Sequence, residues 1–534
     1  MEDWNSGPWC TPMRLMLLLC LQWLIAPYAV GQSGQQLLWS TQAGPTNQAE
    51  EFVAILRAAA IYGLRADDYN AESLLAAQAR LAAAGRSSSL DKRMEFDLAM
   101  STAATRFVNH LHYGRINPRA AGFELPTART DLDVQAAVTA IAHARDVATA
   151  VSVVEPRFYH YAMLKTSLAH YRTLAGDATL TALPPISHSA LHAGDTYAGA
   201  PALRRLLIAL DDMRPGESPS DMATTLDAAL MQALGRFQQR HGLTADGALG
   251  KTTMTELTTP LAQRVRQIEL TLERWRWVPD FDTPPIIVNI PQFELFAFRT
   301  TEDRVADIVE MPVIVGQAYP RTRTPVFIGD LAYVVFRPFW NVPRSITVRE
   351  MLPALRAQPN YLSRNNLELV RGQSDDAPTV VPSPESIGEL AAGKLRLRQR
   401  PGDDNALGLI KFVFPNSHDV YMHSTPAHNL FLQSRRAFSH GCIRVSDPVA
   451  LASYALRNTD GGWSTERILD AMHANSSSRV NLVVPIRVMI LYGTALATEA
   501  GPIRFFDDIY GHDRKLESLL GLEPIHGATA RAGL

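Results

Sequence analysis

Cysteine is nearly absent from this chain of 534 residues, which contains only Cys10, Cys20 and Cys442. The first two lie in or beside an apolar segment near the N-terminus, so Cys442 is the one thiol left if this segment is removed. A disulfide within the shortened chain and a zinc site made of several cysteines are therefore excluded. Composition alone leaves two roles for Cys442, an inert buried thiol and a nucleophile.

The sequence also lacks a strong charge of one sign, since its formal net charge is -2, and it therefore predicts no nucleic-acid partner. Its longest apolar run, LMLLLCLQWLI at residues 15–25, is shorter than the roughly 20 residues that span a bilayer. This run follows Arg14 and precedes the small residues Ala29 and Gly31, which is typical of a secretory signal. We predict a signal peptide at residues 1–31 and an exported protein. An uncleaved inner-membrane anchor and a translation start at Met13 remain open alternatives.

The remaining chain changes texture twice, which predicts a multidomain α+β protein. Apolar residues at helical spacing, as in AEEFVAILRAAAIYGL, predict a helical domain over residues 45–200, ending in a Pro-containing linker. Helix start and stop signals within residues 201–262 predict a small helical module. Runs rich in β-branched and aromatic residues predict a mostly β domain over residues 265–500. A helical and loop insertion at about residues 345–405 is a candidate cap over the site, and residues 501–534 are expected to form a tail.

The small module carries a recognisable pattern around its central turn. A helix containing FQ is followed by GLTADGALGKTTMTEL, and this arrangement resembles the three-helix peptidoglycan-binding module. The matching positions include Phe237, Gln238, Asp246 and Gly247. The resemblance implies contact with peptidoglycan, although a purely architectural role for the module also fits.

The stretch FSHGCIRVSDP, residues 438–448, contains the chemistry-bearing residues. A cysteine attacks acyl carbons as the thiolate and therefore needs a nearby base or positive charge. His440 lies two residues before Cys442, and His423 ends a predicted strand nineteen residues earlier. A metal site made of these three residues is the weaker hypothesis, because Arg444 and Arg436 would repel a cation.

The surrounding loop supplies further candidate groups. Ser439 and the backbone amides of Gly441 and Cys442 are candidate donors to a developing oxyanion. The guanidinium groups of Arg444 and Arg436 are candidate partners for a substrate carboxylate. These neighbours favour the nucleophile over the inert thiol.

The whole stretch HSTPAHNLFLQSRRAFSHGCIRVSDP resembles the active-site signature of the YkuD-type L,D-transpeptidase catalytic domain. The segments ERWRWVP and FVNHLHYGRINP resemble the large periplasmic branch of that family, which has a scaffold domain, a peptidoglycan-binding module and a capped β-sandwich. The resemblance implies that Cys442 is the nucleophile and His423 the base, oriented by a carbonyl near Ser424. It also implies backbone oxyanion donors at Gly441 and Cys442. Tyr421, His440, Gly441 and Arg444 fall on the substrate-site positions of the family, and the loop itself adds Ser439 and Arg436 as candidate substrate-binding residues.

The resemblance implies an enzyme that forms 3-3 crosslinks between diaminopimelate residues of peptidoglycan stems through a thioester, releasing D-Ala, with no metal or cofactor. Its partners would be stem peptides and other cell-wall synthesis proteins. Two other functions remain open, an L,D-carboxypeptidase or crosslink hydrolase on the same scaffold, and a non-catalytic wall-binding protein. The acceptor of the acyl group also remains open between a second stem, water, a D-amino acid and a lipoprotein lysine.

Overall fold

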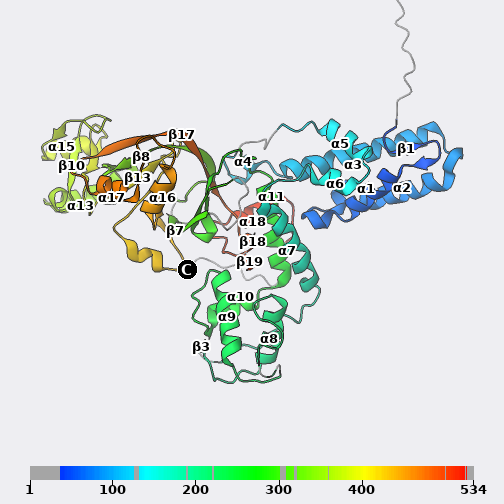
Figure 1. Cartoon of the computed structure of the whole chain (residues 1–534). Coiled ribbons are helices and arrows are strands. Elements are labelled where there is room, and N and C mark those ends of the chain that lie inside the picture. The colour runs from blue at the N-terminus through cyan, green and yellow to red at the C-terminus, as the bar shows by residue number, and fades with distance from the viewer. Residues whose placement is uncertain are drawn as a thin grey trace, which may run out of the picture.

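The computed structural model shows three lobes that extend from a common centre: a helical lobe, a small helical module and a strand-rich lobe with a cap (Figure 1). The leader predicted at residues 1–31 lies outside the residues that the structure describes. Within those residues, no helix is both long and apolar enough to cross a membrane. The described residues are 37–125, 131–187, 190–218, 220, 222–300, 308–317, 322–358, 360–499, 501–523 and 525.

The first lobe is a helical domain around its own apolar core. Side chains of Thr46, Ser89, Asp133 and Asp146 accept hydrogen bonds from the first turns of four of its helices, which fixes where those helices begin. The core is made by residues between Trp39 and Val154. The helices are α1 (Asn47–Arg57), α2 (Ala71–Ala84), α3 (Leu90–Tyr113), α5 (Val134–Ala142) and α6 (Val147–Ser152), preceded by β1 (Ser40–Thr41) and β2 (Gly44–Pro45). The short helix α4 (Pro118–Ala121) follows α3 in the chain but buries Ala121 in the main core.

The boundary predicted at residue 200 differs from the packing. Helix α7 (Tyr159–Ala175) buries Tyr161, Leu164 and Leu168 in the main core rather than in the core of the first lobe. It packs against α11 (Leu261–Trp275) at the centre of the molecule (Figure 1). The helical pattern of α7 is visible in the sequence, but the core that it joins depends on a helix about a hundred residues later.

The small module has the predicted helices and extends further toward the N-terminus than predicted. Part of the expected linker forms a two-stranded pairing, in which Leu191 opposes Leu249. This pairing attaches the Pro-containing segment to the module. The elements are β3 (Ala190–Leu191), α8 (Ala200–Ala209), α9 (Ala228–Arg240), β4 (Leu249–Gly250) and α10 (Lys251–Leu257).

The strand-rich lobe contains a nine-stranded sheet, in keeping with the predicted α+β organisation. The expected sandwich is one continuous sheet, because β6 pairs with β7 as well as with β5 and so closes eight of the strands into a ring. The ninth strand, β15, pairs with β7 outside this ring. Closure leaves no free edge in the ring. The strands are β5 (Ile286–Asn289), β6 (Glu294–Phe298), β7 (Ile308–Gly316), β8 (Phe327–Phe336), β13 (Ile410–Val413), β14 (Met422–His423), β15 (Ala437–Ser439), β16 (Ile443–Val445) and β17 (Ser478–Leu491), with helices α16 (Pro448–Ala455) and α17 (Thr465–His473).

The insertion between β8 and β13 is a small α+β unit with its own core, rather than only helix and loop. Its four strands pair in the order β11-β10-β12-β9, and apolar residues from Val342 to Leu397 form a separate cluster beneath them. The elements are β9 (Trp340–Asn341), α12 (Arg344–Ile346), a π-helical turn (Thr347–Met351), α13 (Leu352–Ala357), α14 (Tyr361–Arg364), β10 (Leu367–Val370), β11 (Thr379–Val380), α15 (Pro384–Ala391) and β12 (Arg396–Gln399).

The expected C-terminal tail is largely an integral part of the centre. The hairpin of β18 (Ala495–Thr498) and β19 (Gly501–Phe505) packs on α7 and α9, and α18 (His512–Leu519) contacts α4 and α11. Phe505 and Leu516 are fully buried there, which explains why this segment is ordered. Residues 526–534 of the predicted tail lie outside the described ranges.

Two motifs that are far apart in the sequence meet where the first lobe joins the centre. The buried carboxylate of Glu273 accepts hydrogen bonds from the backbone amides of Arg115, at 2.5 Å, and Ile116, at 2.9 Å. Gly114 has a φ of 81°, and a Cβ there would lie 2.6 Å from the Trp277 indole nitrogen. YGRIN after α3 and ERWRW at the end of α11 and just beyond it therefore form one junction that requires glycine at 114.

Candidate active site

The candidate site lies where β14 runs parallel to β16 in the closed sheet. Met422 pairs with Ile443, and the amide of Ile443 donates to the carbonyl of Tyr421 at 3.0 Å. This register sets Cys442 beside Tyr421. Because alternate strand residues share a face, His423 and Arg444 point to the same side as Tyr421 and Cys442. Residues that the sequence separates by about twenty positions are thus brought together by one strand pair.

His423 is buried and is held in a defined tautomer. Its Nδ1 lies 2.5 Å from the carbonyl oxygen of Ser424, so Nδ1 carries the proton and donates it to that carbonyl. Burial first, and then the charge of Arg444, lower the pKa of His423 to about 3. The imidazole is therefore neutral at physiological pH, and its Nε2 lone pair is available to accept a proton. The predicted carbonyl near Ser424 is the one observed.

Cys442 is half-buried and is a free thiol, and its surroundings have opposing effects on its pKa. Burial raises the pKa of the Cys442 thiol, and hydrogen bonds from Tyr421 and the charge of Lys411 act in the opposite direction. Its Sγ lies 3.7 Å from the carbonyl oxygen of Asp419. The resting residue is therefore a thiol rather than a preformed thiolate. A neutral thiol on the same sheet face as a neutral imidazole suits ionisation by proton transfer during attack on a carbonyl.

Lys411 is a site residue that the motif does not contain. It pairs with His423 across β13 and β14, and its Nζ lies 3.7 Å from the centre of the Tyr421 ring. Burial lowers the pKa of Lys411, while the charge of Cys442 raises it. The sequence does contain a signal that points to Lys411, because it is a lysine inside the apolar strand IKFVF. Lysine is rarely buried without a partner for its charge.

The loop before Cys442 is fixed by side-chain contacts. The Ser439 hydroxyl donates to the Cys442 carbonyl at 2.5 Å and accepts from the Gly441 amide at 3.1 Å, and Thr324 donates to the Gly441 carbonyl at 2.8 Å. Gly441 has a φ of 116°, which only glycine adopts without strain. The expected oxyanion donor at the Gly441 amide is therefore engaged by Ser439. Ser439 shapes the loop from a buried position instead of facing a substrate.

The two candidate arginines have different surroundings. Arg444 lies on the face of Cys442, and its buried Nε has no hydrogen-bond partner among the described residues. Arg436 instead pairs with Glu294 at 3.0 Å and donates to the carbonyls of Phe293 and Val313. The structure thus leaves Arg444 available to an anion. It places Arg436 in the sheet, away from the expected substrate site.

The cap contacts the site directly. His440, next to the catalytic-loop glycine, lies 2.8 Å from the carboxylate of Glu350, which is in the π-helical turn. Trp340 of β9 hydrogen-bonds to the Tyr421 hydroxyl, an interaction that lowers the pKa of Tyr421 against the larger raising effect of burial. The insertion predicted as a cap therefore lies against the residues that flank Cys442.

The motif residues of the small module hold its central turn together. The Gln238 amide donates to Asp246 and to the Ala248 carbonyl, both at 2.9 Å, and accepts from the Gly247 amide at 2.8 Å. Phe237 and Gln238 are both about 1% exposed. Phe237 and Gln238 are therefore internal supports of the turn, whereas Asp246 is exposed and Gly247 is half-buried.

No group of three or more His, Cys, Asp or Glu side chains suited to a metal ion is found in the part of the chain that the structure describes. The fold is that of a multidomain α+β protein, and its capped, strand-rich domain brings a buried histidine, a thiol and an arginine to one face of the sheet. Comparison with known proteins shows what the chain is similar to. Three family models match the chain: a scaffold domain at residues 29–168, a putative peptidoglycan binding domain at 200–257 and an L,D-transpeptidase catalytic domain at 284–468.

The chain thus carries matches to a scaffold domain, a YkuD-type L,D-transpeptidase catalytic domain and a peptidoglycan binding domain in succession. A putative L,D-transpeptidase of Haemophilus influenzae is 35% identical over 254 residues, which is 47% of this chain. The match spans about half of that relative, 49% of its length.

Proposed function

We propose that this protein is an extracytoplasmic peptidoglycan L,D-transpeptidase that forms 3-3 crosslinks with Cys442 as nucleophile. The observation that carries the proposal is the position of Cys442 in the matched catalytic domain, one strand away from a neutral His423. The half-length match to the relative supports the activity without settling the acceptor. The peptidoglycan-binding module supports cell-wall peptidoglycan as the partner.

In the first step, Cys442 Sγ attacks the carbonyl carbon that joins the third residue of a tetrapeptide stem to the terminal D-Ala. The thiol proton passes to His423 Nε2, and His423⁺ then donates it to the departing amine as the C–N bond breaks. The products are free D-Ala and a thioester on Cys442. The charge of Lys411 and the hydrogen bonds from Tyr421 favour the sulfur anion while it forms.

In the second step, the side-chain amine of a diaminopimelate on another stem attacks the thioester carbon. His423 accepts a proton from that amine, and the Cys442 sulfur leaves and is reprotonated, so the enzyme returns to its starting state. The unpaired guanidinium of Arg444 would hold a stem carboxylate through both steps. The Glu350–His440 contact would keep the cap over the site and limit access of water to the thioester.

The test is mass spectrometry of tetrapeptide muropeptides incubated with the purified protein, with Cys442→Ala and His423→Gln as controls. We expect a dimer that has lost one D-Ala and carries a 3-3 linkage, absent with either variant. Tripeptide monomer alone would assign the protein as an L,D-carboxypeptidase. Unchanged muropeptides, with binding of the protein to intact sacculi, would support the non-catalytic wall-binding function.

A second readout uses carbapenem β-lactams as acylating agents. If Cys442 is the nucleophile, intact mass should increase by one carbapenem, and peptide mapping should locate the adduct on Cys442. The Ser439→Ala variant is the matched control, because it alters the same loop and keeps the thiol. An adduct on the Cys442→Ala protein would contradict the assignment of the nucleophile.

A further inference from the structure

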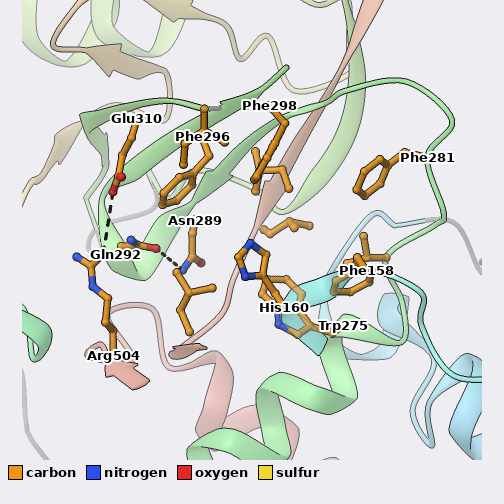
Figure 2. Close-up of a pocket in the computed structure, with 15 residues that line it drawn as sticks. Phe158, His160, Trp275, Phe281, Asn289, Gln292, Phe296, Phe298, Glu310 and Arg504 are labelled. Atoms are coloured by element: carbon orange, nitrogen blue, oxygen red, sulfur yellow. Dashed lines mark hydrogen bonds and ion pairs between the residues drawn. The ribbon is translucent and has the colours of Figure 1, made fainter. Parts of the chain in front are cut away.

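A second cavity lies on the outer side of the closed sheet, and no residue described above for the candidate active site lines it. Ile287 on β5 and Phe296 on β6 alternate with buried residues such as Val288 and Leu295, so their side chains point away from the inside of the ring. Trp275 of α11, labelled in Figure 2, lies against this apolar face, and Leu496 of β18 also lines the cavity. The uncovered part is the cavity.

The cavity has room for one aromatic ring. Its volume is about 110 Å³, of the order of the engineered cavities of about 150 Å³ that bind benzene. Phe158, Phe281 and Phe298 gather at one end of it, as Figure 2 shows, and Trp275 lies near His160 in its wall. This end favours a flat apolar group, because aromatic rings pack well against one another.

The other end carries charge and an unsatisfied donor. Arg504 of β19 and Glu310 of β7 form a loose ion pair of 4.0 Å there, and both side chains are partly exposed (Figure 2). Gln292 is 5% exposed, its oxygen accepts from Asn289 at 3.2 Å, and its Nε2 has no partner among the described residues. The Trp275 indole nitrogen is likewise buried without a partner in the described part of the chain. Buried donors without an acceptor are costly, so the cavity is suited to a ligand that supplies one.

These groups together select the ligand. A purely apolar molecule would leave the Gln292 amide unpaired. An apolar carboxylate would meet Arg504 and Gln292 favourably but would be repelled by Glu310, and an apolar amine would be repelled by Arg504. A zwitterion places its carboxylate toward Arg504 and Gln292 and its ammonium toward Glu310, so that every group has an opposite partner.

We propose that this cavity binds a free apolar α-amino acid, with its side chain among the aromatic residues and its charged groups between Arg504 and Glu310. The site is formed by α7, α11, β18 and β19 together with the catalytic sheet. It therefore lies where the central helices α7 and α11, the C-terminal hairpin and the strand-rich domain meet. This inference is independent of the proposed acyl transfer.

The test is isothermal titration calorimetry of the full chain with four probes: phenylalanine, 3-phenylpropionate, 2-phenylethylamine and alanine. The two enantiomers of phenylalanine are titrated separately, and binding of either one supports the site. We expect phenylalanine to bind about tenfold more tightly than the probes that lack one charge. Alanine, which has both charges but no ring, should not bind. Equal binding of the three aromatic probes would overturn the zwitterion site, as would no binding at about 10 mM.

Two variants assign the binding to this cavity. Arg504→Gln should make phenylalanine and 2-phenylethylamine bind equally, and Glu310→Gln should make phenylalanine and 3-phenylpropionate bind equally. Arg444→Gln is the matched control, because it removes a guanidinium from the candidate active site and should leave phenylalanine binding unchanged. Binding that is lost in Arg444→Gln and retained in Arg504→Gln would place the amino acid beside Cys442 and refute the proposal. Circular dichroism and thermal unfolding check that each variant is folded.

Discussion

Arg444 and Arg436 lie eight residues apart in one motif, and the structure predicts opposite consequences for replacing them with glutamine. Arg444 lies on the face of Cys442 and has a buried Nε without a hydrogen-bond partner in the described part of the chain, whereas Arg436 is engaged with Glu294 and two backbone carbonyls. Arg444→Gln should therefore impair turnover and leave stability nearly unchanged. Arg436→Gln should destabilise the catalytic domain and leave the kinetics of the folded fraction nearly unchanged.

The magnitudes follow from these surroundings. A hydrogen bond to a charged group contributes about 1.5–3 kcal/mol. Losing one between Arg444 and a stem carboxylate should thus lower kcat/KM about 10- to 150-fold. The Arg436 and Glu294 side chains are only 12% and 14% exposed. Removing one member of a buried ion pair costs about 3–5 kcal/mol. This figure applies above pH 7, where Glu294 is ionised, and a glutamine that keeps some of the carbonyl contacts should bring the loss toward its lower end.

The assays are muropeptide turnover followed by chromatography and urea unfolding followed by circular dichroism. Both variants and the unaltered protein are measured at one pH and one ionic strength, because charge pairs depend on both. If Arg436→Gln raised KM at unchanged stability, the side chain would have to reach the substrate. If Arg444→Gln kept full kcat/KM, the unpaired guanidinium would have no role in binding a carboxylate.

Three further predictions concern pH and the cap. Because burial lowers the pKa of His423 to about 3, kcat/KM should show no acid limb near pH 6.5. Because burial raises the pKa of the Cys442 thiol, kcat/KM should still rise on the alkaline side of neutrality. A bell-shaped profile centred near pH 6 would contradict a resting state in which both groups are neutral. Burial raises the pKa of Glu294 from 4.5 to about 7, so between these pH values the folded chain holds a proton that the unfolded chain releases. The free energy of unfolding should therefore fall as pH rises from 4.5 to about 7. Urea unfolding across this range should show a flatter pH dependence for Glu294→Gln. The Glu350 and His440 side chains are 52% and 40% exposed, so their pair contributes at most about 1 kcal/mol. Glu350→Gln should therefore speed iodoacetamide labelling of Cys442 by up to about 5-fold, and high salt should have the same effect on the unaltered protein. If neither the variant nor high salt changed the labelling rate, the pair would not control access of the reagent to Cys442.

The cap and the site differ in how far the sequence anticipates them. The insertion is predictable because a polar segment interrupts a β pattern, yet its own four-stranded sheet is not. Its strands are short and pair across long separations, as in the pairing of Trp340 with Gln399. Local propensity does not specify such pairings. The contact of Glu350 with His440 depends on this fold and has no signal in the sequence.

The sequence by itself determined the chemistry-bearing loop, because a lone cysteine, its histidines and a glycine follow one another within a short motif. It also determined the succession of a helical lobe, a module and a strand-rich domain, because hydrophobic periodicity is local. Only the tertiary structure separated Arg444 from Arg436, added Lys411 to the site and engaged the Gly441 amide with Ser439. These outcomes depend on strand register and on which buried groups find partners, and both are set by contacts between residues far apart in the chain.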